Sequence, residues 1–242
     1  MDGIEQIKGG GILSAIRTIL TVLVLLSLGF LIAINVSNKP PAKDKVWDLA
    51  TTMGDPEAKK HYVMYTDMMC PFCDVFSRTI KSHKEEFEKE YLEKQGILFE
   101  VRVTDFLGEY GQHKHPGSRW SAEGAHCAAK QNRFWDYYYA GLDRLWEDYH
   151  SKGIGVGPRS PQITGMTEGY WLKIGADLGL GEEFNRCMTE DSTVEQIKKN
   201  SEKTANSIQG GLPFFKFGKF TTSGFDQSWG WDRAKQMLDA GL

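Results

Sequence analysis

The pattern of hydrophobic and polar positions separates an apolar N-terminal segment from a longer region that mixes strand-like and helix-like stretches. Residues 18–36 form a run of 19 residues without a charged side chain. A run of that length can cross a lipid bilayer as a single helix. The next stretch, 37–45, is rich in lysine, and its two adjacent prolines interrupt a helix and favour an extended linker. We therefore expect an N-terminal tail and transmembrane anchor over 1–36 and a linker over 37–45.

A cleaved signal peptide is the alternative interpretation of the apolar run, because Lys8 and Arg17 precede it. The run is longer than the apolar core of signal peptides, which is about 7–15 residues, and the residues before Val36 make a poor cleavage site. The pattern therefore favours an uncleaved anchor. Basic residues lie on both sides of the run, so the positive-inside rule leaves its orientation open.

After the linker, the periodicity predicts an α/β domain over 46–242. Its predicted elements are a strand at about 61–66, a helix at about 70–94, a strand at about 97–103, a helical block at about 118–207, a hairpin at 212–222 and a final helix at 228–242. Within the block, 121–149 has one long helical pattern. A strand, a helix and a strand in this order favour a right-handed crossover between two parallel strands. The helical block is therefore predicted to be a large insertion in this α/β domain.

Composition excludes some classes of function. The chain has 242 residues, which is enough to bury a full core, and its 29 basic and 32 acidic residues give a formal net charge of −3. No run of five or more basic residues occurs. The sequence therefore gives no reason to expect nucleic acid as a partner.

Cys70 and Cys73 form a C-x-x-C pair between the first predicted strand and the following helix. A zinc site would need a second pair of ligands at short spacing, whereas Cys127 and Cys187 lie 60 residues apart. A purely structural disulfide in so small a loop would restrict the unfolded chain little. At the start of a helix, however, the unpaired amides and the positive end of the helix dipole stabilise a thiolate. The context therefore favours a redox pair without a metal or another cofactor.

Three stretches of the chain carry a resemblance to a known family. They are the "CPFC" that follows a strand ending in Tyr-Thr-Asp, the segment "AHCAAKQNRFWDYY" in the helical block, and "GGLPFF" before the hairpin. Together, over about 46–242, they resemble the DsbA-like thiol-disulfide oxidoreductases of the thioredoxin superfamily. The resemblance implies a thioredoxin-like fold, Cys70 as the nucleophile, Cys73 as the resolving cysteine, and Pro213 as a cis-proline opposite the motif.

The resemblance also implies what the site binds. A cis Leu212–Pro213 bond would leave the backbone of Leu212 free to pair with an extended substrate peptide, although an ordinary proline at a strand edge is the alternative. The implied partners are exported proteins with free thiols and a quinone-linked membrane protein that reoxidises the pair. We expect a membrane-anchored, extracytoplasmic enzyme that introduces disulfides. An isomerase or reductase on the same fold, or a non-catalytic anchored chaperone, remains an alternative.

Several further residues are candidates with less specific signals. Phe72 stands between the cysteines where strong oxidants of this family carry histidine, so the oxidising power is expected to be lower. In an oxidising compartment two free cysteines are a liability, so we expect a structural disulfide between Cys127 and Cys187 rather than two buried thiols. His113 and His115 suggest a solvated turn more than a metal site. The sequence leaves open whether Asp67 is an ordinary loop carboxylate or tunes the thiol.

Overall fold

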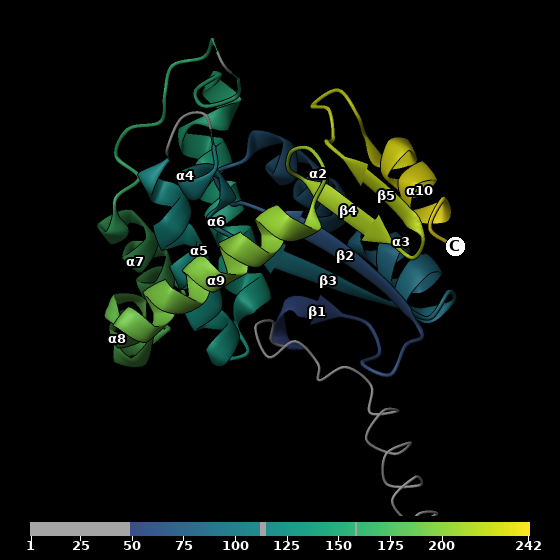
Figure 1. Ribbon diagram of the computed structural model, residues 1–242, viewed down its shortest axis with the longest axis horizontal. Helices are drawn as coiled ribbons and strands as arrows, with labels where there is room; N and C mark the ends of the chain where they lie inside the picture. The colour runs from purple at the N-terminus through teal and green to yellow at the C-terminus, as the bar shows by residue number, and fades with distance from the viewer. Residues whose placement is uncertain (1–48, 112–114, 158) are drawn as a thin grey trace, which may run out of the picture. The chain divides into compact units, whose positions relative to one another are not determined.

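The computed structural model describes residues 49–111, 115–157 and 159–242 (Figure 1). The predicted anchor over 1–36 and the predicted linker over 37–45 lie outside these residues. In the described ranges, no helix combines the length and the apolar character that crossing a membrane requires. The candidate metal ligand His113 also lies outside the described residues.

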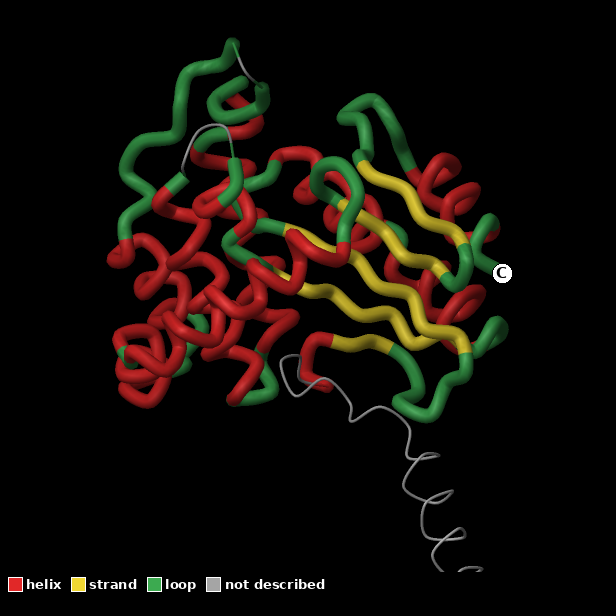
Figure 2. The backbone as a smooth tube through the Cα atoms, viewed as in Figure 1, coloured by secondary structure: helices red, strands yellow, loops and turns green. Residues whose placement is uncertain are grey.

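Five strands form one mixed sheet in the order β1-β3-β2-β4-β5, and Figure 2 shows them side by side. Their bounds are β1 (Thr52–Met53), β2 (Lys60–Thr66), β3 (Ile97–Val103), β4 (Phe214–Phe217) and β5 (Phe220–Ser223). β2 and β3 are parallel, and the other neighbouring pairs are antiparallel. The predicted parallel pair and C-terminal hairpin are confirmed. The sequence does not predict β1, because two residues are too few to show an alternating pattern.

The crossover between β2 and β3 is not the single helix that the sequence predicts over 70–94. It consists of α2 (Pro71–Ser82), α3 (Lys84–Phe87) and a π-helical segment, η2 (Glu88–Glu93). The break lies at His83, whose ring stacks on Trp231 of α10 (Trp231–Asp239) with 5.0 Å between ring centroids. The imidazole Nδ1 also lies 3.0 Å from the carbonyl oxygen of Thr79. The prediction of a single helix was wrong because the backbone of His83 leaves the helical conformation, with φ −117° and ψ 29°.

The helical block lies between β3 and β4, as predicted. Its elements are α4 (Phe106–Glu109), α5 (Pro116–Lys130), α6 (Phe134–Asp148), η3 (His150–Lys152), α7 (Glu168–Asp177), α8 (Gly181–Thr189) and α9 (Asp191–Ser207). The stretch 121–149, with its single helical pattern, is divided between α5 and α6. The division occurs at Asn132, whose φ of 58° is left-handed, a conformation that asparagine tolerates better than most residues. A local turn therefore ends α5 and lets α6 fold back against it.

Alternate residues of the central strands point to one face of the sheet and form the core with α2. Phe215 of β4 packs on Phe76 of α2 with 4.6 Å between ring centroids, and Tyr62 of β2 stacks on Phe217 at 4.8 Å. In Figure 1, α9 crosses in front of β2 and β3. The contact between Phe76 and Phe215 packs α2 against the sheet. Because β2 ends at Thr66 and α2 begins at Pro71, the first turn of α2 lies at the carboxyl end of this central strand.

Candidate functional site

Cys70 occupies the N-cap position of α2. Its backbone is extended, with φ −84° and ψ 114°, and Pro71 occupies the first turn, where a missing N–H costs little. The sulfur accepts a hydrogen bond from the backbone N–H of Cys73 at 3.4 Å, while the N–H of Cys70 donates to the carbonyl of Asp67 at 3.0 Å. The Cys70 sulfur therefore lies at the positive end of the helix, the position that stabilises a thiolate.

Both cysteines are buried; Cys73 is completely enclosed, whereas Cys70 at the helix terminus is 4% exposed. Both cysteines are free thiols in this structure. Burial raises the pKa of the Cys73 thiol well above its usual range, and the neighbouring Cys70 raises it further. The hydroxyl of Thr66 and the N–H of Asp67 oppose this shift but do not cancel it. Cys73 is thus a protonated thiol shielded from solvent, whereas Cys70 occupies the helix terminus.

The loop that contains Leu212 and Pro213 lies against Cys70. The Leu212–Pro213 peptide bond is cis, and the thiol of Cys70 donates to the carbonyl oxygen of Leu212 at 3.6 Å. The carbonyl of Pro213 accepts a hydrogen bond from Gly224 at 2.7 Å, which ties this loop to the residue that follows β5. The fold therefore brings together two predicted parts of the site that are 142 residues apart in the sequence.

Asp67, which the sequence left undecided, is a completely buried carboxylate that holds the segment before Cys70. Its oxygens accept hydrogen bonds from the N–H of Met69 at 2.9 Å, the N–H of Leu107 at 2.8 Å, and the hydroxyl of Ser118. Burial raises the pKa of Asp67 to about 6, although hydrogen bonds from Ser118, Leu107, Met69 and Phe106 lower it. Asp67 therefore links the active-site loop to α4 and α5.

A second buried carboxylate lies on the other side of the cysteine pair, and sequence reasoning missed it. Asp74 follows Cys73 directly, and its Oδ2 lies 3.1 Å from Nδ1 of His150, at the start of η3. Both side chains are completely buried. Nothing in the sequence pairs these residues, because they are separated by 76 positions and belong to different elements.

The other two cysteines form a disulfide, the pairing expected from the sequence. Cys127 of α5 and Cys187 of α8 are joined with an S–S distance of 2.03 Å and lie 5.8 Å apart at their Cα atoms. This bridge ties two helices of the insertion together. Across the described ranges, no group of three or more His, Cys, Asp or Glu side chains could hold a metal ion.

The surface beside Cys70 carries apolar side chains. Phe72, in the first turn of α2, is 37% exposed, and a small cavity of about 280 Å³ adjoins Met69, the residue before Cys70. Trp120 of α5 and Met166, before α7, also line this cavity. An apolar recess therefore lies beside the helix terminus that carries the reactive sulfur.

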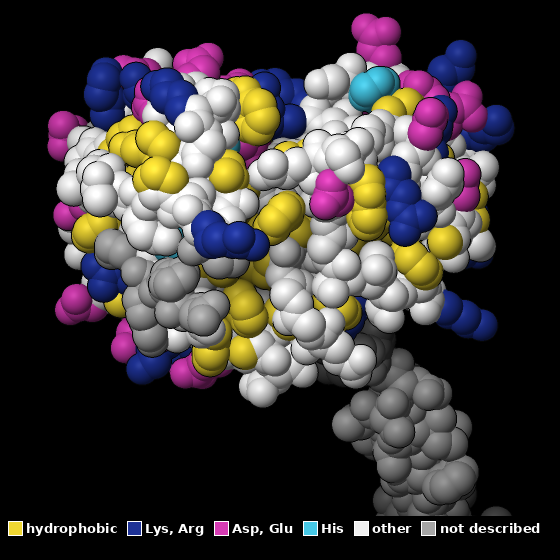
Figure 3. All heavy atoms as spheres, turned by 90° about the horizontal axis from the view of Figure 1, so that it is seen from above, with side chains coloured by type: hydrophobic (Ala, Val, Ile, Leu, Met, Phe, Trp, Pro, Cys, Tyr) yellow, Lys and Arg dark blue, Asp and Glu magenta, His cyan; other side chains and the backbone are white. Residues whose placement is uncertain are grey.

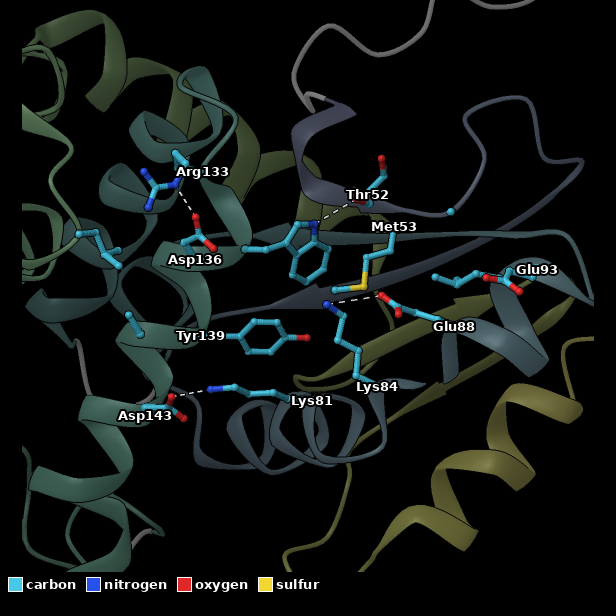
Figure 4. A pocket seen from close by; sticks show the side chains of 15 residues that line it. Thr52, Met53, Lys81, Lys84, Glu88, Glu93, Arg133, Asp136, Tyr139 and Asp143 are labelled. Carbon is cyan, nitrogen blue, oxygen red and sulfur yellow. Dashed lines mark hydrogen bonds and ion pairs between the residues drawn. The ribbon is translucent and has the colours of Figure 1, made fainter. Parts of the chain in front are cut away.

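A larger cavity of about 850 Å³ lies between β1, α6 and the helices of the crossover, and no cysteine lines it. Figure 4 shows opposite charges paired along its wall: Lys81 with Asp143, Lys84 with Glu88, and Arg133 with Asp136. Glu93 also lines the cavity and adds one acidic side chain to these three pairs. Because no cysteine lines the cavity, thiol chemistry belongs to the N-terminus of α2.

Comparison with known proteins agrees with this geometry. The family model described as thioredoxin matches residues 49–210. The structure of oxidised BdbD from Bacillus subtilis is similar with a TM-score of 0.58 and 18% identity, over 81% of this chain and 93% of that chain. alpha-DsbA1 from Wolbachia pipientis is similar with a TM-score of 0.56 and 16% identity, over 85% of this chain and 94% of that chain. A thioredoxin-like oxidoreductase from Silicibacter pomeroyi DSS-3 is similar with a TM-score of 0.56 and 18% identity, over 81% of this chain and 92% of that chain.

No curated protein matches the chain. The structural likeness, at 16–18% identity, establishes a shared fold, and the thioredoxin match extends over more than half of the chain. The C-x-x-C pair lies at a helix N-terminus in this fold, with one sulfur at the helix terminus and the other enclosed. The chain therefore belongs to the thioredoxin family and is a thiol-disulfide oxidoreductase, with the fold of the BdbD and alpha-DsbA1 structures.

Proposed function

We propose that this chain is a membrane-anchored, extracytoplasmic oxidant that transfers the Cys70–Cys73 disulfide to cysteine pairs of exported proteins. The observation that carries the proposal is the asymmetry of the two sulfurs. Cys70 lies at the N-cap of α2 against the carbonyl of Leu212, whereas Cys73 is enclosed one turn further on. Such an arrangement suits attack at Cys70 and resolution by Cys73.

The exchange proceeds in two displacements. A substrate thiolate attacks Sγ of Cys70 in the oxidised enzyme, which forms a mixed disulfide and expels the Cys73 sulfur. The leaving sulfur takes up a proton, as its burial and raised pKa favour. A second substrate thiolate then attacks the substrate sulfur of the mixed disulfide and releases Cys70 as a thiolate. The substrate loses two electrons and becomes a disulfide, while the enzyme gains two electrons and becomes a dithiol.

The loop at Leu212 is proposed to position the substrate. A peptide that lies extended beside the cis Leu212–Pro213 bond can pair with the backbone of Leu212, and this places its cysteine next to Cys70. Apolar residues of the substrate can contact Phe72 and the recess beside Met69. The size of the Leu212 side chain would restrict which substrate peptides fit beside the cis bond.

As an oxidant, the enzyme would accept electrons from its substrates and pass them to a second protein. A quinone-linked membrane protein would return Cys70 and Cys73 to the disulfide state after each cycle. An isomerase or a reductase would use the same two sulfurs but would work mainly in the dithiol form. Phe72 supplies no imidazole to stabilise the Cys70 thiolate, which favours a moderate rather than a strong oxidant. A measured reduction potential for Cys70–Cys73 distinguishes these activities.

Trapping of mixed disulfides tests the proposed mechanism. The exchange is reversible, so the Cys70 thiolate can also attack a disulfide of an exported protein, which forms the same mixed disulfide and expels one substrate thiolate. Replacing Cys73 by alanine keeps this reaction but removes the sulfur that would attack Cys70 Sγ and release the substrate. We expect reductant-sensitive adducts with exported proteins in cells that carry Cys73→Ala, and few or none in cells that carry Cys70→Ala. Adducts that accumulate on Cys73 in the Cys70→Ala variant would mean that the roles are reversed. Equal thiol-oxidation activity of Cys70→Ser and the unmutated chain would favour an anchored chaperone instead.

The proposed location has its own test. An oxidant and a stable second disulfide both require an oxidising compartment, so residues 37–242 should face outward. Protease added to spheroplasts should then digest this region while cytoplasmic proteins survive. Complete protection in sealed cells, with digestion only after lysis, would place the domain on the inner side and contradict the proposal.

A further inference from the structure

The pair formed by Asp74 and His150 lies directly behind the reactive cysteine. Asp74 belongs to the first turn of α2, and its backbone N–H donates to the carbonyl of Cys70 at 3.0 Å. Residues four positions apart on a helix are neighbours on its surface, with Cβ atoms about 5–6 Å apart. Asp74 is therefore a completely buried carboxyl one helical turn from Cys70, and the buried Asp67 is the other carboxyl close to Cys70 in the chain.

His150 compensates the charge of Asp74 from the opposite side. Its Nδ1 lies 3.1 Å from Oδ2 of Asp74, and both side chains are shielded completely from water. The remaining atoms of the pair, Oδ1 of Asp74 and Nε2 of His150, have no hydrogen-bond partner in the part of the chain that the structure describes. The two side chains thus depend mainly on each other, and a charge on either one is poorly screened.

Other charged groups face the pair only from a distance or from the surface. Burial raises the pKa of Asp74, whereas the hydrogen bond and charge of His150 lower it, as does the charge of Arg78. Arg78 of α2 is itself paired with Asp143 of α6 at 2.8 Å, and Lys81 binds the same carboxylate at 2.5 Å. These three groups are partly exposed. They therefore neutralise one another, and His150 is the completely buried side chain that contacts Asp74.

We propose that the Asp74–His150 pair tunes the thiolate of Cys70, with the Asp74 carboxylate opposing the thiolate and His150 limiting that opposition. The two residues act through Cys70 and are positioning residues, since neither touches the substrate. The proposal rests on thiol–disulfide exchange at Cys70–Cys73. It is independent of whether exported proteins are the substrates.

Removing each partner should shift the Cys70 thiol in opposite directions. Asp74→Asn keeps the shape of the side chain and removes the opposing charge, so the pKa of the Cys70 thiol should fall. His150→Gln leaves the carboxylate without its counter-charge, so that pKa should rise. A unit charge within about 12 Å contributes at least about 1.4 kcal/mol at an effective dielectric constant of about 20, so we expect the thiolate population to change by at least about tenfold. The same tenfold change in the exchange equilibrium with glutathione corresponds to about 30 mV.

The experiment titrates the thiolate of the full chain. Absorbance at 240 nm, measured for the reduced minus the oxidised protein across pH 3–10, reports the pKa of the Cys70 thiol in each variant. Reduction potentials against glutathione report the second effect. The matched control is Asp136→Asn, which removes an aspartate of α6 whose ion pair with Arg133 is exposed. The control should shift neither the thiol pKa nor the potential.

A measurement on the unmutated chain keeps the proposal testable if a variant fails to fold. Coupling between two sites is reciprocal, so a thiolate at Cys70 must raise the pKa of His150 by the amount that His150 lowers the thiol pKa. NMR titration should therefore give a higher imidazole pKa for His150 in the reduced than in the oxidised protein. Equal values in the two redox states, shifts of the same sign in Asp74→Asn and His150→Gln, or shifts no larger than the control would each overturn the proposal.

Discussion

Replacing Asp67 by asparagine should change how the stability of the protein depends on pH. The carboxyl is completely buried, and burial raises its pKa from 3.8 to about 6, although hydrogen bonds act in the opposite direction. The native state therefore binds a proton more tightly than the unfolded chain does. The stability that this proton confers is fully present below about pH 3.8 and is lost as the pH rises through about 6.

The two pKa values determine the size of the effect. Integration of the proton difference gives a penalty for the ionised native carboxyl of about 1 kcal/mol at about pH 4.5 and about 3 kcal/mol at about pH 7.5. Asparagine does not titrate, so the stability of Asp67→Asn relative to the unmutated protein should improve by about 2 kcal/mol across this range. The amide cannot accept all the hydrogen bonds of the carboxylate. The free-energy cost of the lost hydrogen bonds shifts the stability difference between the two proteins by a constant amount. It does not change how that difference depends on pH.

Urea unfolding at several pH values between 4.5 and 7.5 measures this difference, with linear extrapolation to water at each pH. Asp226→Asn is the matched control, because Asp226 is exposed and Ser228 holds its pKa below the usual value. Its difference curve should be shallow and of opposite sign. A flat curve for Asp67→Asn, or a curve that falls as the pH rises, would mean that the hydrogen bonds outweigh burial and that the reasoning is wrong.

Three further predictions concern the cysteines and their neighbours. Replacing both Cys127 and Cys187 by alanine should lower the free energy of unfolding by about 4 kcal/mol in urea, because the bridge closes a loop of 60 residues; a loss below about 1 kcal/mol would contradict this. Pro213→Thr should lengthen the lifetime of mixed disulfides on Cys70 in single-turnover gels, since it disturbs the backbone that presents the substrate; unchanged lifetimes would refute this. Phe72→His should raise the reduction potential, because an imidazole stabilises the thiolate; a potential equal to that of the unmutated chain argues against it.

The distribution of charged side chains on the surface bears on how the protein recognises its partners. Acidic and basic side chains are interspersed over the face that Figure 3 shows, without a broad area of one sign. This distribution is consistent with the near balance of charges in the composition, 29 basic against 32 acidic residues. Recognition of a protein substrate near Cys70 would therefore depend on backbone pairing and apolar contact more than on long-range electrostatic attraction.

The sequence by itself determined the features that depend on local pattern. Alternating apolar residues placed β2 and β3 in the chain, and a helical pattern directly after the first strand placed the C-x-x-C pair at a helix terminus. These signals are read over fewer than about 20 residues, where periodicity and helix capping act. The cis Leu212–Pro213 bond and the partner of Cys127 were also anticipated, the first through family resemblance and the second by counting cysteines.

Only the tertiary structure decided which buried groups meet. The pairing of Asp74 with His150, the donation to Asp67 by Leu107 and Ser118, and the stacking of His83 on Trp231 all depend on contacts between residues far apart in the chain. A local pattern contains no information on such contacts, because the energy of a buried charge is set by the side chains that the whole fold places around it. The chemistry of Cys70 and its neighbour loop at Leu212–Pro213 was therefore readable from the sequence, whereas the buried carboxyls and their distant partners were not.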